Sequence, residues 1–228
     1  MNSVVLATSG GKDSLLALDA LLASGQWHVS ALLATLWVEP DGSEWIAGHG
    51  IPASLLRAQA EALGIPLRPM RIPLGADDDR YGVALEESLE QIAWLDPLIS
   101  HLAFGDLFLE DIRAFRERLL SRLGWQALFP LWGLATAQLA QHFLARGWRA
   151  LVVAIDPERV PEDLLGREYD RDFLAALPPD CDPCGENGEF HTFVWDGPRF
   201  RHRLRLERGG VRRRPGQLTL ELSLAASA

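Results

Sequence analysis

The sequence predicts an α/β protein in which a parallel sheet has helices on both faces and is followed by a smaller α+β domain with a C-terminal β-hairpin. In the first half, apolar runs of strand length alternate with segments of helical period. A glycine-rich turn joins the first strand to the first helix. Near the C-terminus, apolar and polar residues alternate, as they do in a half-buried hairpin.

The elements of the first half follow one another as strand and helix. Val4, Val5 and Leu6 form the first apolar run, and residues 14–23 place most of their leucines on one helical face. The same alternation continues to about residue 123. We expect further strands at 29–38, 67–72 and 98–104, and helices at 52–63, 81–94 and 109–123.

The second half changes in character after a helix at 136–145 and a strand at 150–155. A stretch rich in proline, aspartate and glycine covers residues 156–187. We place the domain boundary near Gly124–Phe129, where the regular strand–helix alternation of the first half ends, which gives a nucleotide-binding domain at 1–125 and a substrate domain at 126–228.

Alternation returns at residues 199–207 and 217–224, which predicts the two strands of the hairpin. Glycine pairs and a Pro-Gly step between them supply the turn region. Arg212, Arg213 and Arg214 fall in that region, where we expect a solvated tip; a contact with RNA is the alternative.

Composition narrows the function classes. The chain has 228 residues, 48% of them hydrophobic, and a formal net charge of −9. This charge makes nucleic acid an unfavourable partner, and no apolar run predicts a membrane span. Because the sequence begins directly with a strand and the glycine-rich turn, we expect no signal peptide and a cytoplasmic location. A homodimer is compatible with these features.

The turn after the first strand has the composition of a phosphate-binding loop. Glycines let the backbone approach a ligand closely, and a helix N-terminus favours negative charge. Lys12 adds a cation, and Asp13 is a suitable ligand for Mg²⁺. The spacing differs from the Walker A pattern, and an ordinary Gly-Gly turn is the alternative. The loop consists of Ser9, Gly10, Gly11, Lys12, Asp13 and Ser14.

A second polar cluster precedes the strand that begins near Phe190. Carboxylates, an amide, an imidazole and a hydroxyl beside glycines indicate close approach to a ligand. The alternative is a polar loop in which Glu186 caps backbone N–H groups. The cluster consists of Glu186, Asn187, Gly188, Glu189, Phe190, His191 and Thr192.

The only two cysteines, Cys181 and Cys184, form a Cys-x-x-Cys pair. We interpret them as part of a loop packed beside a site. Half of a zinc site with His191 and His202, or a redox dithiol, are the alternatives.

Four motifs in this order resemble the diphthine–ammonia ligase family, a branch of the ATP pyrophosphatases. The resemblance extends from Val4 to about Phe200. It implies an adenine nucleotide α-hydrolase fold with a second domain, and the ATP-dependent amidation of diphthine with release of pyrophosphate and AMP. The motifs are Ser9–Ser14, His49–Pro52, Phe104–Asp111 and Glu186–Thr192.

The resemblance also implies roles for residues. We expect ATP at the glycine-rich loop with His49 and Gly105, and Mg²⁺ at Asp13. Lys12 offsets phosphate charge. The catalytic set is Lys12, Asp13, Glu186, Glu189 and His191, and the acceptor set is Asp106, Asn187, Gly188 and Thr192. ATP, ammonium or another amine, and a carboxylate on a protein or small molecule are the expected partners.

The chain departs from the family pattern Glu-Gly-Gly-Glu-Phe/Tyr-Glu-Thr at Asn187 and His191. Its composition, rich in Ala, Leu, Trp and Arg, indicates a bacterial member, for which diphthine is an unexpected acceptor. Two alternatives therefore stay open: an adenylating ATP pyrophosphatase with another acceptor, and a non-enzymatic ATP sensor.

Overall fold

A computed structural model describes residues 2–226 of the chain. The described residues form two compact units. Unit 1 comprises residues 2–8, 13–44 and 65–133, and unit 2 comprises residues 9–12, 45–64 and 134–226. The chain passes between the units several times, so each is built from separate segments of the sequence.

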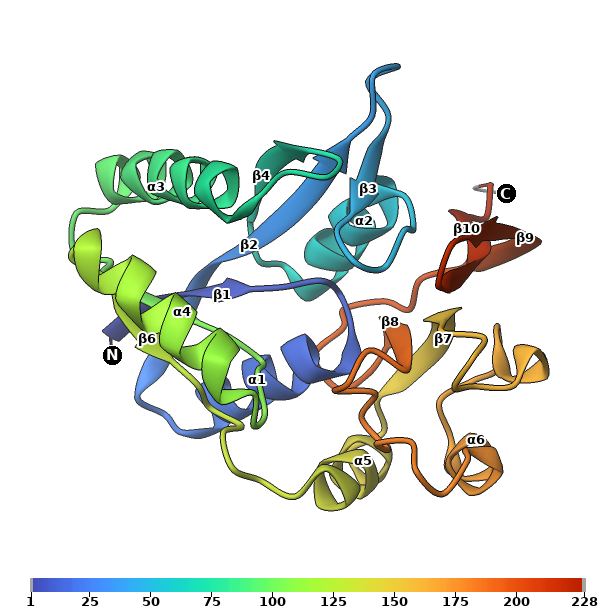
Figure 1. Cartoon of the computed structure of the whole chain (residues 1–228). Coiled ribbons are helices and arrows are strands. Elements are labelled where there is room, and N and C mark those ends of the chain that lie inside the picture. Colours follow the sequence, from blue (N-terminus) through green and yellow to red (C-terminus); the bar gives the residue numbers. More distant parts are fainter. Residues whose placement is uncertain (1, 227–228) are drawn as a thin grey trace. The chain divides into compact units, whose positions relative to one another are not determined.

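Unit 1 contains a parallel sheet whose strands lie in the order β4, β2, β1, β5, β6, of which Figure 1 labels all but β5. The long strand β2 pairs with β1 through its first half and with β4 through its second half. The bounds are β1 Asn2–Ala7, β2 Trp27–Val38, β4 Leu67–Pro73, β5 His101–Ala103 and β6 Gln126–Leu128.

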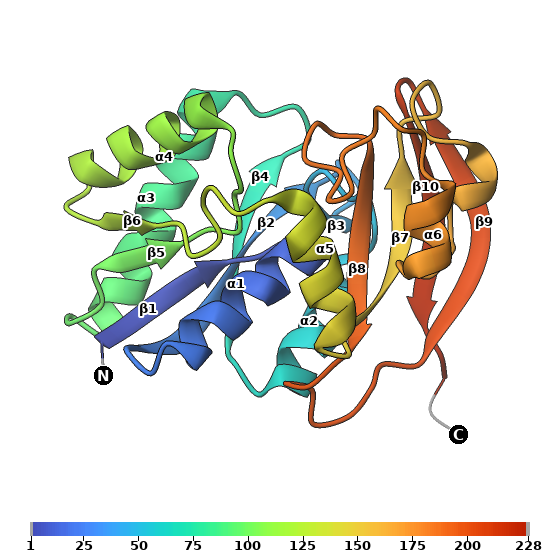
Figure 2. The same cartoon turned by 90° about the horizontal axis from the view of Figure 1, so that it is seen from below.

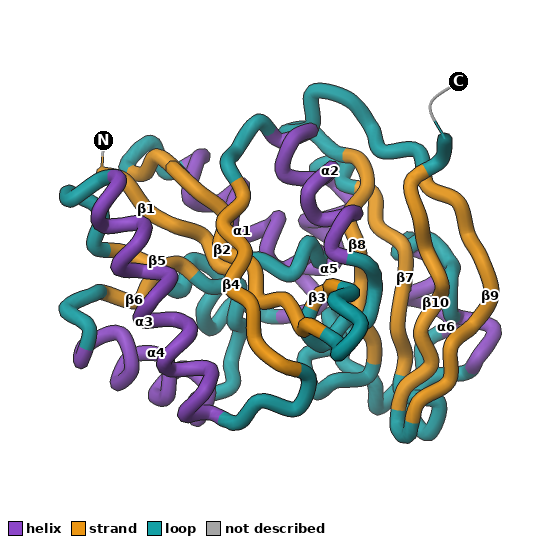
Figure 3. The backbone as a smooth tube through the Cα atoms, turned by 90° about the horizontal axis from the view of Figure 1, so that it is seen from above, coloured by secondary structure: helices purple, strands orange, loops and turns teal. Residues whose placement is uncertain are grey.

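Helices cover both faces of this sheet, as the sequence predicts (Figures 2 and 3). Val5 of β1 belongs to a buried cluster with Leu85 and Leu89 of α3 and Leu120 of α4. Val4 and Leu6 point to the opposite face because side chains alternate along a strand, and α1 lies on that face. The bounds are α1 Lys12–Ala23, α3 Asp78–Leu95 and α4 Glu110–Arg122.

The strand order changes direction between β1 and β5, which are neighbours although β2 and β4 separate them in the sequence. Ligands of such sheets bind at the carboxyl ends of the strands beside this switch point. The glycine loop (residues 9–14) follows β1, and Gly105 follows β5. The topology of unit 1 therefore brings the ends of both strands to one edge of its sheet.

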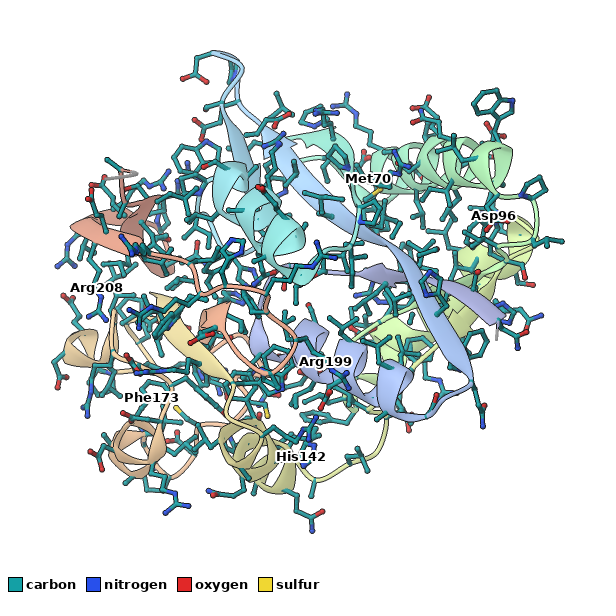
Figure 4. All side chains as sticks on the ribbon, turned by 180° about the vertical axis from the view of Figure 1, so that it is seen from behind. Met70, Asp96, His142, Phe173, Arg199 and Arg208 are labelled. Carbon is teal, nitrogen blue, oxygen red and sulfur yellow. The ribbon has the colours of Figure 1, made fainter. Side chains whose placement is uncertain are left out.

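Unit 2 contains an antiparallel sheet in the order β8, β7, β10, β9, with helices α2, α5 and α6. Part of its core is aromatic, and includes Tyr169, Phe190 and Phe173, the last labelled in Figure 4. The bounds are α2 Ala53–Leu63, α5 Thr136–Ala145, β7 Arg149–Ile155, α6 Arg171–Ala176, β8 Phe190–Asp196, β9 Leu206–Arg214 and β10 Gln217–Leu224.

The C-terminal hairpin is present, but its first strand is displaced from the predicted position. Strand β9 begins at Leu206, because the backbone of residues 199–205 bonds elsewhere: Arg201 N–H donates to Ala62 and Leu204 N–H to Trp195. The turn is Pro215–Gly216, and the glycines at 209 and 210 lie opposite Glu221 in a β-bulge.

The arginines at 212–214 therefore lie within β9 and not at the tip, which corrects the predicted position. The structure also contains short elements that the sequence patterns do not predict: β3 Glu44–Ile46, β6, the 3₁₀ turn η1 Glu162–Leu164 and α6. Among residues 2–226, no helix is long and apolar enough to cross a lipid bilayer.

Candidate functional site

The glycine loop is held by contacts within unit 2. The Gly10 carbonyl accepts hydrogen bonds from Gln59 Nε2 at 2.9 Å and from the Val194 N–H at 2.9 Å. Gly10 has a φ of +76°, and a Cβ there would lie 3.0 Å from the side chains of Leu56 and Phe193. Both the conformation and the close packing therefore require glycine at this position.

Gln59 connects the loop to strand β8, because its Nε2 also donates to the Val194 carbonyl at 2.6 Å. The side chain is fully buried on α2. The sequence analysis does not identify Gln59 as a site residue, although a glutamine on the apolar face of a helix indicates a buried hydrogen bond.

Lys12 begins helix α1 and is 3% exposed. Its backbone N–H donates to Thr192 Oγ1 at 3.1 Å, and its ammonium donates to the Cys184 carbonyl. The ammonium also lies 5.5 Å from the ring centroid of Phe190 and 5.8 Å from that of Tyr169. The carbonyl oxygen and the two aromatic ring faces thus replace part of the water that would otherwise solvate this buried charge.

His49 and His191 lie next to the loop, with ring centroids 4.7 Å apart. A Cβ on Gly11 would lie 3.2 Å from His49 Nε2 and 3.1 Å from the Thr192 carbonyl oxygen, so the backbone of Gly11 packs closely on both. His49, His191 and Thr192 were all predicted as site residues, and they gather around the loop.

Burial keeps both imidazoles neutral. Desolvation, with a further contribution from the Lys12 ammonium, lowers the pKa of His191 to about 4. Desolvation also lowers the pKa of His49 well below its ordinary range. The His191 ring and the Lys12 ammonium lower this pKa as well. Two neutral rings beside an ammonium can orient a ligand by hydrogen bonds without adding charge.

Glu189 is fully buried and holds the loop in which the second cluster lies. Its carboxylate accepts from the N–H groups of Asp182 and Asn187 at 3.0 and 2.9 Å, and from the Asn187 side chain at 3.1 Å. Arg159 Nη2 lies 2.9 Å away. Desolvation alone would raise the pKa of Glu189, but these bonds and Arg159 together lower it.

Arg159 ties the same loop a second time, because its Nη1 donates to the Asn187 carbonyl at 2.9 Å. The many bonds to Glu189 favour a structural role for this carboxylate over proton transfer. Asn187 and Gly188 are exposed and Glu186 is half-buried, with its N–H donating to Asp182 Oδ1 at 3.4 Å. Sequence reasoning did not identify Arg159, which lies 30 residues before Glu189.

The other predicted site residues, Asp13, Ser14, Gly105 and Asp106, belong to unit 1. A Cβ on Gly105 would lie 2.9 Å from the Asp13 carbonyl group and 3.1 Å from the Ser14 nitrogen. Glycine therefore lets the chain after β5 approach the first turn of α1.

Asp106 forms an ion pair with Arg116, whose Nε lies 2.6 Å from its Oδ2. The Arg116 guanidinium is in turn 4.1 Å from the ring centroid of Phe104. These contacts fix Asp106 beside the end of β5. Within residues 2–226, no group of three or more His, Cys, Asp or Glu side chains is arranged to hold a metal ion by itself.

Comparison with known proteins gives matches over both halves of the chain. The model for the diphthamide synthase N-terminal domain matches residues 1–127, and that for the C-terminal domain matches residues 135–214. Three similar curated proteins are each named diphthine–ammonia ligase. The Schizosaccharomyces pombe protein is 25% identical over 86% of this chain, which spans 34% of that protein's length. The bovine and human proteins are 26% and 25% identical over 88% of this chain and 81% of their own lengths.

Proposed function

Because the chain belongs to the diphthamide synthase family, we propose that it is an ATP-dependent ligase that forms an amide from a carboxylate and ammonia. One observation supports this proposal most: the glycine loop and the 186–192 segment, which are far apart in the sequence, meet within unit 2. The hydrogen bond from the Lys12 N–H to Thr192 Oγ1 spans 180 residues of sequence. A phosphate-binding loop beside a polar acceptor segment is what such a reaction requires.

In the proposed reaction, an oxygen of the acceptor carboxylate attacks the α-phosphorus of ATP. The bond between the α-phosphorus and the oxygen that bridges to the β-phosphate breaks. The products of this step are an acyl-adenylate and pyrophosphate. Ammonia then attacks the acyl carbon, AMP leaves with the electrons of the acyl carbon–oxygen bond, and the nitrogen releases one proton to solvent to give the neutral amide. Such chemistry depends mainly on positioning and charge neutralisation, and does not need a covalent nucleophile.

The residues of the glycine loop fit a triphosphate. A Cβ at Gly10 would meet Leu56 and Phe193, and one at Gly11 would meet the Thr192 carbonyl, so glycine lets the loop turn tightly against these groups. We assign the N–H groups of this turn to phosphate oxygens. Ser9 and Ser14 add hydroxyl groups, and the Cys184 carbonyl holds the Lys12 ammonium in place to offset phosphate charge. Asp13 is the carboxylate that would hold Mg²⁺, which would supply further charge neutralisation.

The acceptor and the amine are assigned to the 186–192 segment. Glu186 is half-buried whereas Glu189 is enclosed by its own loop, so we assign proton removal from ammonium to Glu186 and loop positioning to Glu189. His191, with Asn187, Gly188 and Thr192, orients the acceptor, and its neutral ring suits hydrogen bonding better than proton transfer. His49 and Gly105 are assigned to the nucleotide, and Asp106 to the acceptor or amine.

Diphthine on a protein is the acceptor that the names of the relatives suggest. A different carboxylate is the second candidate, because His191 stands where the family pattern has glutamate. The cytoplasm is the proposed location, since ATP is available there. We also propose that the boundary between the two domains lies between residues 125 and 126.

The proposal is tested with ATP labelled at the α-phosphate, Mg²⁺ and ammonium, with AMP and pyrophosphate as the measured products. If AMP and pyrophosphate form only when a carboxylate acceptor is present, the result supports ligase activity. ATP binding without AMP formation, whichever acceptor is supplied, would contradict it and favour a sensor.

A further inference from the structure

The C-terminal hairpin contacts the turn that carries His49, at residues 46–51. We propose that Arg212 and Gln217 of this hairpin are positioning residues that fix His49 against the glycine loop, and we call this pair the hairpin clamp. The inference rests on the proposed function, in which the glycine loop binds the phosphates of ATP.

The turn itself is tight. Ile46 N–H donates to the Ile51 carbonyl at 2.8 Å, and Gly50 N–H donates to the Ile46 carbonyl at 3.0 Å. Gly48 and Gly50, on either side of His49, have φ angles of +77° and +65°. These positive angles are accessible to glycine at little steric cost, so the histidine is presented between two flexible residues.

The hairpin clamp binds the carbonyl groups on both sides of His49. Arg212 Nη2 donates to the Gly50 carbonyl at 2.8 Å, and Gln217 Nε2 donates to the Gly48 carbonyl at 2.8 Å. The Arg212 guanidinium also stacks 4.0 Å from the ring centroid of Trp45, just before the turn. The two flexible glycines are therefore restrained from outside the turn.

The position fixed in this way matters because His49 packs on the loop. Its Nε2 would lie 3.2 Å from a Cβ on Gly11, its Nδ1 lies 3.3 Å from the Ala47 carbonyl oxygen, and its ring contacts His191. The charged or titratable groups that act on His49 are His191 and Lys12. A displaced His49 would lose its contact with the backbone that is assigned to the phosphates.

Arg213 provides a matched control on the same strand. It alternates to the other side of β9, is exposed, and forms an ion pair with Glu162 at 2.8 Å. Replacing it removes an arginine from the hairpin without touching the 46–51 turn.

The test compares Arg212→Ala, Gln217→Ala and Arg213→Ala in the full chain by two measurements: the NMR titration of the His49 ring, and the Kd for ATP with Mg²⁺. In the two clamp variants, we expect the pKa of His49 to rise toward its ordinary value and ATP to bind about tenfold more weakly, equivalent to about 1.4 kcal/mol. Arg213→Ala should match the wild type, and Arg212→Lys, which keeps a donor and the charge, should restore part of the loss.

Unchanged His49 ring signals in both folded clamp variants would overturn the inference. If Arg212→Ala does not fold, the result for Gln217→Ala decides whether the inference holds, because this change removes a single side-chain hydrogen bond. If the wild type does not bind ATP, the proposed function fails, whereas the His49 titration still tests the clamp by itself.

Discussion

Lys12 is a charged residue that the fold buries almost completely. Its position is set at both ends, by the backbone bond to Thr192 and by the bond from the ammonium to the Cys184 carbonyl. An ammonium held in this way can meet a phosphate without first ordering a flexible side chain. The position of its charge is therefore the property on which the proposed chemistry depends most.

Replacing Lys12 by alanine should abolish ATP turnover while the protein remains folded, because the charge that offsets the leaving phosphates is lost. We expect AMP formation to fall by about 100-fold or more, the range seen when one group that stabilises a transition state is removed. Lys12→Met, which keeps an apolar stem, is the control for packing. Unchanged turnover in a folded Lys12→Ala variant would remove the basis for the loop assignment.

The low pKa of His191 predicts a pH-dependent stability. Between pH 6.5 and about 4 the unfolded chain binds a proton at this ring and the folded chain does not, so stability should fall as the pH decreases through this window. The full effect is roughly 3 kcal/mol. Urea unfolding at several pH values should therefore show a shallower acid dependence for His191→Gln. The exposed His202→Gln is the control, and an identical dependence in both variants would contradict the prediction.

At the scale of elements, two segments are stabilised by single buried side chains. Gln59 on α2 joins the glycine loop to β8, and Glu189 organises the loop before β8 together with Arg159. Each supplies two or more hydrogen bonds to the segment that it holds. Removal of one such side chain typically destabilises a protein by about 1–3 kcal/mol.

Gln59→Leu should lower the free energy of unfolding by about 1–3 kcal/mol, because the carbonyls of Gly10 and Val194 lose a common donor. It should also weaken ATP binding, since the glycine loop loses a restraint. Chemical denaturation and ATP titration measure the two effects. Glu61→Leu, at an exposed position of the same helix, serves as the control. A folded Gln59→Leu variant with wild-type stability would show that this bridge is unimportant.

Glu189→Gln and Arg159→Ala should each destabilise the protein, and their effects should not add, because the two side chains share one network. A double-mutant cycle of unfolding free energies measures the coupling, for which we expect about 0.5–3 kcal/mol. If the effects are additive, the pair does not act as a unit. Normal stability of Glu189→Gln with loss of product formation would instead return this carboxylate to the catalytic set.

Long, regular elements could be predicted from the sequence, whereas short ones could not. The helix at 136–145 and the strand at 217–224 have the predicted bounds, because their periodic patterns extend over their whole length. Elements such as β6 and α6 are too short for a period and depend on tertiary contacts. The alternation at 199–205 predicts a strand wrongly, because those backbone groups bond to Ala62 and Trp195 instead.

At the scale of the whole molecule, the sequence carries the fold class and the family, both of which are confirmed. The site could be predicted only in part. Gly10, Lys12 and His191 belong to dense motifs, but Gln59, Arg159 and the Cys184 carbonyl act on partners distant in the sequence. A backbone carbonyl leaves no signature in the residue type, so that contact requires the structure.

The most direct test of the account follows the nitrogen of ammonium into the product. The full chain is incubated with ATP, Mg²⁺, isotopically labelled ammonium and a protein acceptor carrying diphthine, and AMP and the labelled acceptor are quantified. We expect equal amounts of AMP and labelled amide from the wild type, and neither product from Lys12→Ala. AMP without labelled amide would contradict diphthine as the acceptor, and ATP binding without AMP would contradict the ligase itself.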